Sequence, residues 1–384
     1  MWRKIDSFYA PIIIWLVVKI GLFVHLGTVI ANDSPRYIRY ANHLLKGGKV
    51  VGDFDSNYIF YSVIIAFFHK TGLGINGVVF CQIFFSGLSC YFLYQMAISL
   101  FGKKECGVIA IIGYSGWIFA QQWDFYILTD SLFTSFCVWI AYLVVCYKGR
   151  SKEALIFTLI IFLCTLRPNG FVMGIAFVGY LLNQLHEKNR WLFWKVLSCL
   201  PILLIFLIYY LNGALKSYFP SLIYGNYLEG EIISGYEGFL LNTEDVEFPD
   251  PNGEPVPEMI AFAYHNPFFA LKMIFYKVFF FFGHIRPFYS QIHNIIIMLV
   301  LYPCYLFSII TVRKYNIEQS AKVFISTFIF SQAAVVAFYM EDWDGRFLLP
   351  VIPFVFLLAS PQINNFFNPD FSKRHLANSA DTLE

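Results

Sequence analysis

A series of long apolar segments constrains this chain more than any other feature of its sequence. A bilayer core is crossed by about 20 consecutive apolar residues, with a usual range of about 17–25. Over the 384 residues, 58% are hydrophobic and only 14% are charged, whereas soluble domains carry about 25% charged residues. So few charges cannot cover the surface of a water-soluble protein, and we predict an all-α polytopic membrane protein. The predicted spans are residues 10–30, 75–100, 107–122, 131–147, 153–168, 170–185, 193–211, 294–312, 321–340 and 346–362.

Basic residues fall in alternate loops between the predicted spans. By the positive-inside rule, such loops are cytoplasmic. The pattern therefore predicts about ten spans, two cytoplasmic termini, and two large outer loops over residues 31–74 and 212–293. The basic residues are Arg3, Lys4, Lys103, Lys104, Lys148, Arg150, Lys152, Lys188, Arg190, Lys195, Arg313, Lys314, Lys322, Lys373 and Arg374.

Two apolar stretches, residues 58–68 and 268–283, do not fit this pattern as crossings. The first is too short to span a bilayer, and a crossing by the second would place Arg313 on the outer side. We predict that both are juxtamembrane helices at the outer face. Together these features predict one transmembrane domain over residues 1–365, followed by a flexible cytoplasmic tail over residues 366–384.

Composition and motifs exclude several classes of function. The net charge of +2 gives no basic field that would attract nucleic acid. The 8 cysteines include no CxxC pair, which indicates buried thiols rather than a disulfide framework. The chain has no glycine-rich phosphate loop, no HExxH motif and no nucleophile elbow. These absences argue against an ATP-driven pump and against a hydrolase of the soluble type.

Two carboxylates stand at predicted helix starts in the outer loops. Asp33 precedes Ser34 and Pro35, which predicts a helix with Ser34 as its N-cap, and Asp130 begins a predicted span. One interpretation is that each carboxylate only stabilises a helix start. The other is that the two face each other across an outer vestibule, where Asp33 acts as a general base. The same loops supply the predicted vestibule residues Tyr37, Tyr58 and Asp124.

Three arginines stand at predicted outer helix ends or in the outer loops. Arg167 and Arg286 each precede a proline, and Arg346 begins the last predicted span. Charge at membrane depth marks a site or an ion pair, although snorkelling of the side chain to the interface is the alternative. The planar fork of a guanidinium suits phosphate. We therefore regard these arginines as candidates for binding a phosphate.

A metal site has little support in the sequence. Asp53 and Asp55 have the DxD spacing with which some nucleotide-sugar enzymes hold a metal, but a solvated acidic loop gives the same pattern. No other motif predicts a metal ligand. A divalent cation, Mg²⁺ or Mn²⁺, therefore stays open as a cofactor.

Several short motifs follow one another in a characteristic order along residues 10–365. They are Asp33 with Tyr37 and Ala41, the stretch Tyr58 to Gly74, Thr129-Asp130-Ser131-Leu132-Phe133, Leu166-Arg167-Pro168, His265-Asn266-Pro267, Arg286-Pro287-Phe288-Tyr289-Ser290, and Gly345-Arg346-Phe347-Leu348-Leu349-Pro350-Val351-Ile352-Pro353. This set resembles the GT-C superfamily of membrane glycosyltransferases, near the protein O-mannosyltransferases and the lipid A aminoarabinose transferase. The chain departs from the family pattern in having Asp130 where Glu is usual, and Ser56-Asn57 where prolines and a basic residue are usual.

The resemblance implies an inverting glycosyltransferase that takes a sugar from a polyprenyl-phosphate donor. The acceptor would be a hydroxyl group of a lipid, a glycan or a protein at the outer face, and a bacterial inner membrane is the expected location. Asp33 would be the base, and Asp130 would orient the acceptor or hold the charge state of the pair. The donor phosphate would bind Arg346 and Arg167, with Arg286 as a further member of the set.

Two other functions stay open at this point. A lipid-linked sugar flippase or transporter would have charged residues in the middle of its spans, and the predicted spans are nearly free of them. An oligosaccharide polymerase or ligase would use the same carboxylates and arginines with a longer lipid-linked donor.

Overall fold

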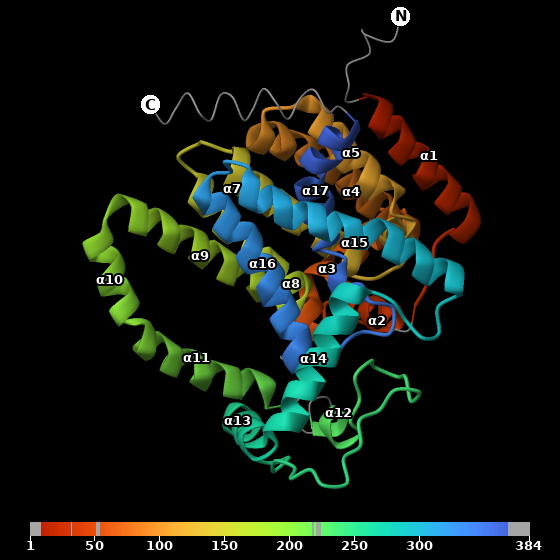
Figure 1. The fold of residues 1–384 in the computed structure, drawn as a ribbon. Coiled ribbons are helices and arrows are strands. Elements are labelled where there is room, and N and C mark those ends of the chain that lie inside the picture. The colour runs from red at the N-terminus through yellow and green to blue at the C-terminus, as the bar shows by residue number, and fades with distance from the viewer. Residues whose placement is uncertain (1–8, 32, 51–53, 217–218, 220–223, 368–384) are drawn as a thin grey trace, which may run out of the picture. The chain divides into compact units, whose positions relative to one another are not determined.

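The computed structural model describes residues 9–31, 33–50, 54–216, 219 and 224–367, shown as coloured ribbon in Figure 1. Over these residues the chain is helical, and the only β-structure consists of isolated bridges such as that between Val29 and Tyr126. The prediction of an all-α protein is therefore confirmed for the described part of the chain.

The helices vary widely in length. Their bounds are α1 Tyr9–Leu26, α2 Ser34–Leu45, α3 Ile59–Lys70, α4 Gly74–Phe101, α5 Lys104–Gly116, α6 Ile118–Gln121, α7 Asp130–Cys146, α8 Lys152–Leu166, α9 Phe171–Lys188, α10 Arg190–Ser198, α11 Leu200–Leu215, α12 Tyr224–Leu228, α13 Pro255–His265, α14 Pro267–Gly283, α15 Gln291–Lys314, α16 Gln319–Phe338 and α17 Ile352–Phe367. Short 3₁₀ turns are η2 Phe54–Tyr58, η3 Gln122–Phe125, η4 Pro168–Gly170 and η6 Arg346–Leu348.

Four of the described helices, α1, α4, α15 and α16, are long and apolar enough to cross a membrane. Two shorter apolar helices, α7 and α17, have 17 and 16 residues. This agrees with a membrane protein. The count of about ten spans, the orientation of the chain and the side of its termini stay predictions.

The chain divides into two compact units. Unit 1 consists of Met1–Phe177, Leu299–Ile325 and Leu349–Glu384, and unit 2 consists of Val178–Met298 and Ser326–Leu348. The single domain over residues 1–365 stays a prediction.

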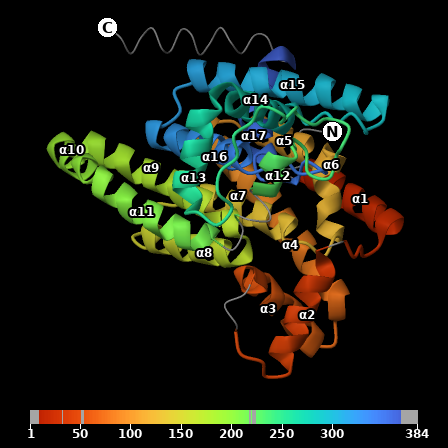
Figure 2. The ribbon, with the colours of Figure 1, turned by 90° about the horizontal axis from the view of Figure 1, so that it is seen from below.

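The centre of unit 1 is a bundle in which α4 and α17 flank α5, and α7 packs on α4 (Figures 1 and 2). A small residue makes the close approach of α5 and α17 possible, because a Cβ atom at Gly113 would lie 2.5 Å from the ring of Phe356. Small residues serve the same purpose in membrane helix pairs, where the packing of side chains replaces the hydrophobic effect. The aromatic rings of Phe92 and Tyr142 stack at 4.4 Å between α4 and α7.

The two helices of the first predicted outer loop, α2 and α3, pack on each other within unit 1. The predicted short helix over residues 58–68 corresponds to α3. The prediction that Ser34 caps α2 is wrong: Asp33 holds the N-cap position without a side-chain cap bond, and Ser34 is the first helical residue. The Ser34 hydroxyl instead donates to the carbonyl of Ile127, at 2.9 Å, because that distant strand-like segment lies beside the helix start.

Unit 2 has its own apolar core around α13 and α14. The rings of Tyr227 and Phe262 stack at 4.9 Å, and Ile232 and Ile233 are fully buried beside them. Outside this core, α13 and α14 carry exposed apolar side chains, among them Tyr264 and Phe268.

Gly170→Ala is expected to destabilise unit 1. The added Cβ would lie 2.6 Å from the backbone nitrogen of Cys164 and the carbonyl carbon of Leu163. Backbone cannot move aside as a flexible side chain can, and we expect a loss of about 1–3 kcal/mol, measured by thermal unfolding in detergent. Gly21→Ala is the matched control, because a Cβ there meets nothing within 4 Å. Equal unfolding midpoints for the two variants would contradict the close packing of η4 on α8.

Candidate functional site

The candidate site in unit 1 is built around Tyr37 and Tyr58. One face of α2 is buried, with Ser34, Tyr37, Tyr40 and Ala41 at helical spacing. Tyr37 is therefore held against its neighbours, with its ring 5.2 Å from that of Tyr58 and 5.3 Å from that of Tyr61.

Arg36 lies beside these rings and was not singled out from the sequence. Its guanidinium carbon is 5.4 Å from the centre of Tyr37 and 5.2 Å from that of Tyr58. Its Nε atom is 3.2 Å from the Asp55 carboxylate, and its Nη2 atom is 4.0 Å from that of Asp33. The arginine at position i+3 of a helix-start aspartate was the signal available in the sequence.

Asp130, at the start of α7, and Arg167, just after the end of α8, form an ion pair in which the aspartate is buried. Because the ring of Pro168 disfavours helical backbone in the residue before it, Arg167 ends α8 in an extended conformation, with φ −153° and ψ 131°. Its Nη1 atom binds the Oδ1 atom of Asp130. The helix-cap interpretation of Asp130 is not needed, because the carboxylate has this partner and Thr129 occupies the N-cap position.

The two carboxylates and Arg167 act on the same tyrosines. Burial raises the pKa of Tyr37 strongly, and Tyr58, Asp33 and Asp130 raise it further, while Arg167 lowers it. Burial also raises the pKa of Tyr58, against the opposing effect of Arg167 and Arg36. Both phenols therefore stay protonated near neutral pH, and a protonated phenol has a hydrogen to donate to a bound ligand.

Exposure distinguishes the two predicted carboxylates. The side chain of Asp33 is 40% exposed, whereas that of Asp130 is 2% exposed and tied to Arg167. Unit 1 thus brings together the predicted residues Asp33, Tyr37, Tyr58, Asp130 and Arg167. Only Asp33 among the two carboxylates is open to a solvent molecule or a substrate.

Asp124 lies apart from Asp33, in the interior of unit 1. Its Oδ2 atom is 2.5 Å from the Nζ atom of Lys19, and its Oδ1 atom accepts a hydrogen bond from Ser131 at 2.5 Å. The predicted role of Asp124 in an outer vestibule is therefore replaced by a buried ion pair. Lys19 is a single lysine in the middle of apolar α1, and it was not singled out from the sequence. A charged residue inside an apolar helix indicates a buried ion pair or a functional site, so the sequence did contain a signal for this pair.

Arg286 has a structural role within unit 2. It is 1% exposed and pairs with Glu341, which is fully buried. Its Nη1 atom also donates to the carbonyls of Phe280 and Ile285, at 2.9 and 3.1 Å. A guanidinium that is buried and bonded in this way has no surface for a donor phosphate, and we remove it from the predicted phosphate set.

Arg346, the third predicted phosphate ligand, also belongs to unit 2. Its side chain is 20% exposed, and Nε and Nη2 donate to the two carboxylate oxygens of Asp342 at 3.0 and 2.9 Å. Its role in binding a phosphate stays a prediction.

The described residues include no group of three or more His, Cys, Asp or Glu side chains that could hold a metal ion. Asp53, half of the DxD pattern, lies outside the described residues. Its partner Asp55 is engaged by Arg36.

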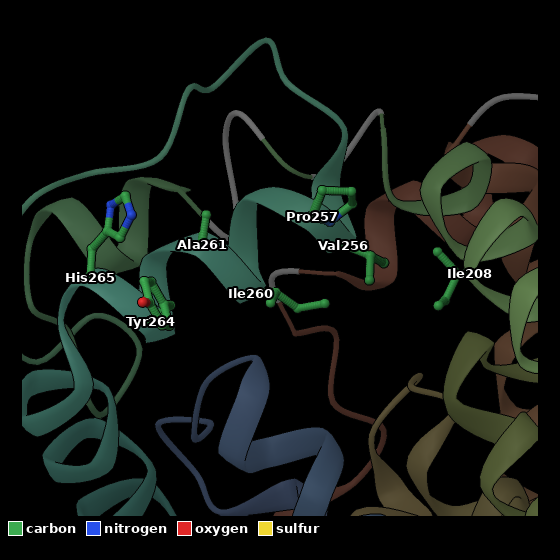
Figure 3. A pocket seen from close by; sticks show the side chains of 7 residues that line it. All are labelled: Ile208, Val256, Pro257, Ile260, Ala261, Tyr264 and His265. Atoms are coloured by element: carbon green, nitrogen blue, oxygen red, sulfur yellow. The ribbon is translucent and has the colours of Figure 1, made fainter.

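An apolar groove of about 490 Å³ opens in unit 2 between α11 and α13. Figure 3 shows Ile208 of α11 across from Val256 and Ile260 of α13. At the far end His265 pairs through Nδ1 with Glu247 at 3.1 Å. Apart from His265 and the hydroxyl of Tyr264, the side chains that line the groove are apolar, so the groove offers mainly hydrocarbon contacts.

Comparison with known proteins adds no relative to this description. No family model matches the chain, and neither the curated proteins nor the solved structures include a match.

Asp130→Asn and Arg167→Ala are each expected to lower the free energy of unfolding by about 3–5 kcal/mol, because each leaves the opposite charge buried without this partner. The double variant should lose less than the sum, since its second change removes the charge that the first left behind. Thermal unfolding in detergent measures both effects. The control is Glu254→Gln, which removes an exposed ion pair with Lys216 and should change little. Additive losses would show that Asp130 and Arg167 do not interact.

His284 should make unit 2 less stable in acid. Burial lowers the pKa of His284 to about 3, with Arg286 and His293 adding to the shift. In the unfolded chain the ring takes up its proton near pH 6.5, so its contribution to stability is present above about 6.5 and is lost as the pH falls towards about 3. Between these limits, wild type should lose stability relative to His284→Gln in pH-dependent unfolding experiments. Parallel curves for the two proteins would contradict a buried neutral ring.

Proposed function

We propose that this protein is an inverting glycosyltransferase of the GT-C type, which moves a sugar from a polyprenyl-phosphate donor to an acceptor hydroxyl at the outer face of a membrane. One observation carries the proposal: the accessible carboxylate of Asp33 and the Asp130–Arg167 pair lie around the same two protonated tyrosines. A base beside a cation is what displacement of a lipid phosphate requires.

The chemistry is an in-line displacement at the anomeric carbon. Asp33 takes the proton of the acceptor hydroxyl while its oxygen attacks the anomeric carbon from the face opposite the phosphate. The bond between that carbon and the phosphate oxygen breaks, and its electron pair leaves with polyprenyl phosphate. The configuration of the sugar is inverted, and no general acid is needed because a phosphate ester oxygen leaves readily as an anion.

The residues around Asp33 have complementary roles in this proposal. Arg167 and Arg36 stabilise the departing phosphate, because the planar fork of a guanidinium matches phosphate oxygens and carries the opposite charge. Asp130 holds Arg167 in place. The hydroxyl groups of Tyr37 and Tyr58 donate hydrogen bonds to the sugar or the phosphate. Arg346 enters the proposal only through its motif.

The lipid part of the donor has apolar surfaces to contact. Val63 and Phe67 of α3 are exposed in unit 1, and the groove along Ile208 and Ile260 is apolar in unit 2. Exposed side chains of this type are stable in lipid rather than in water.

We further propose the topology that the loop charges predict: about ten spans, cytoplasmic termini, and Asp33 facing the exterior of a bacterial inner membrane. Supporting this topology, the basic residues fall in alternate loops and the acidic loops include Asp33 and Asp130.

A lipid-linked sugar flippase is the second candidate, favoured by Lys19. This lysine lies in the middle of a candidate membrane span and pairs with Asp124. Transporters use such intramembrane charges along a substrate path. The Lys19–Asp124 pair is buried on all sides, whereas Asp33 is accessible, and we therefore prefer the transferase.

Purified protein in nanodiscs, given radiolabelled polyprenyl-phosphate hexoses and pentoses and an extract of the host membrane as acceptor, should transfer sugar. Asp33→Asn should reduce the rate by about 10²–10⁴-fold, because the base is lost while donor binding is kept. Arg167→Lys and Arg346→Ala test the phosphate contacts. Asp245→Asn, an exposed aspartate of unit 2, is the matched control and should keep the wild-type rate.

Three results would decide between the candidates. Transfer that survives Asp33→Asn at full rate would discard the proposed base. Loss in Asp33→Asn and Arg167→Lys but not in Arg346→Ala would restrict the phosphate site to unit 1. No transfer from any donor, together with movement of lipid-linked sugar across a proteoliposome bilayer, would establish the flippase instead.

A further inference from the structure

The segment from Gln122 to Ser131 connects the two carboxylates of the candidate site. At its carboxyl end it carries Asp130 into α7. In its middle it holds the chain that leads to Asp33: Val29 donates to the carbonyl of Phe125 at 2.8 Å, and Ile127 donates to the carbonyl of Val29 at 3.0 Å. The position of this one segment therefore determines where both carboxylates lie.

The same segment is held a second time next to Asp33. The hydroxyl of Ser34 donates to the carbonyl of Ile127 at 2.9 Å and accepts from the amide of Ala31 at 2.8 Å. Since Ser34 follows Asp33 directly, a shift of Ile127 would move the start of α2.

Lys19 and Asp124 anchor this segment to α1. The Nζ atom of Lys19 is 2.5 Å from the Asp124 carboxylate and donates to the carbonyl of Gln121 at 3.0 Å. Ser131, the neighbour of Asp130, donates to the other oxygen of the Asp124 carboxylate at 2.5 Å. One buried carboxylate thus joins the middle of α1 to the first turn of α7.

Gln82 of α4 anchors the segment from the other side. Its side-chain amide donates to the carbonyls of Asp124 and Tyr126, at 2.8 and 2.9 Å. Its Oε1 atom accepts from the hydroxyl of Tyr61 at 2.9 Å, and the Tyr61 ring packs edge-on against Tyr37. Hydrogen bonds and ring packing therefore link the interior pair with the tyrosines of the candidate site.

We propose that Lys19 and Asp124 are positioning residues, which set the distance between Asp33 and Asp130 by fixing the segment Gln122–Ser131; the inference rests on the proposed function of those two carboxylates. An ion pair suits this role in an apolar interior. Among the described residues, Lys19 and Asp124 form their salt bridge with each other, and the buried carboxylate of Asp124 fixes where the ammonium of Lys19 lies.

The kinetic test compares Asp124→Asn in two backgrounds. In otherwise wild-type protein, we expect kcat for sugar transfer to fall by about 10- to 100-fold with a smaller change in KM, because misplacement of a catalytic group by about 1 Å has effects of this size. In the Asp33→Asn background most of that factor should disappear, since the group that is positioned has already been removed. A loss of folded protein alone would give the same factor in both backgrounds and would overturn the proposal.

Hydrogen–deuterium exchange gives a readout that does not depend on activity. In Lys19→Met and in Asp124→Asn, exchange should become faster in residues 122–131 and in residues 27–34, and should stay unchanged in residues 138–146 of α7. Lys152→Met is the matched control, because Lys152 contacts the far end of α7 through the carbonyl of Val144 at 2.7 Å. Unchanged exchange in either segment would overturn the positioning role.

If the single variants fold poorly, the double variant Lys19→Met/Asp124→Asn replaces them, because it leaves neither charge of the pair buried alone. Its stability should recover, while hydrogen exchange in residues 122–131 and 27–34 should stay fast. Slow exchange in the folded double variant would overturn the proposal. Fast exchange without any sugar transfer by wild type would support the positioning of the carboxylates and overturn the transferase.

Discussion

The ion pair between Asp130 and Arg167 is the contact on which the polar part of unit 1 depends. It joins the first residue of α7 to the last residue before Pro168, and it neutralises a carboxylate that is almost without exposure. Around it lie Tyr37 and Tyr58, whose raised pKa values reflect burial together with the carboxylates. Without Arg167, Asp130 would be a buried charge with an unfavourable solvation energy, and the start of α7 would be unstable where it is now.

Several described charges in the interior form buried ion pairs, whereas the side chain of Asp33 is partly exposed. Lys19 pairs with Asp124, and Arg286 pairs with Glu341. In unit 2, the second pair holds the segment before Arg346, because Arg286 also binds the carbonyls of Asp342 and Trp343 at 3.3 Å. Asp33 is different: its carboxylate is 40% exposed and lies 4.0 Å from the Nη2 atom of Arg36. A partly exposed carboxylate that is held near buried charges is a candidate for proton transfer.

Local rules account for those features that depend on neighbours in the sequence. Pro168 requires an extended Arg167, and the apolar face of α2 follows from the spacing of Tyr37, Tyr40 and Ala41. The apolar segments predicted helices throughout, and the helices are present in the described residues. The grouping of Asp33 with Asp130 was expected because both stand at helix starts in acidic loops.

Features that depend on packing between distant segments could not be predicted in the same way. Ser34 looked like an N-cap, but its hydroxyl binds Ile127, which lies in another loop. Asp124 and Arg286 were predicted to be site residues because each is a charged residue in a loop. The sequence alone does not show which distant residue pairs with such a charge. Their partners, Lys19 and Glu341, are far along the chain and are selected only when the helices pack. Of these residues, only Lys19 indicated a buried ion pair from the sequence, because a lysine inside an apolar helix needs a counter-charge.

The most direct measurement of the central claim is an electron cryomicroscopy structure of the protein in nanodiscs with bound polyprenyl phosphate. We predict phosphate density in contact with Arg167 or Arg36, within reach of the Asp33 carboxylate, and an apolar tail leading away into the bilayer. Phosphate bound elsewhere, with Asp33, Tyr37, Tyr58 and the Asp130–Arg167 pair untouched, would contradict the assignment of this cluster as the transferase site.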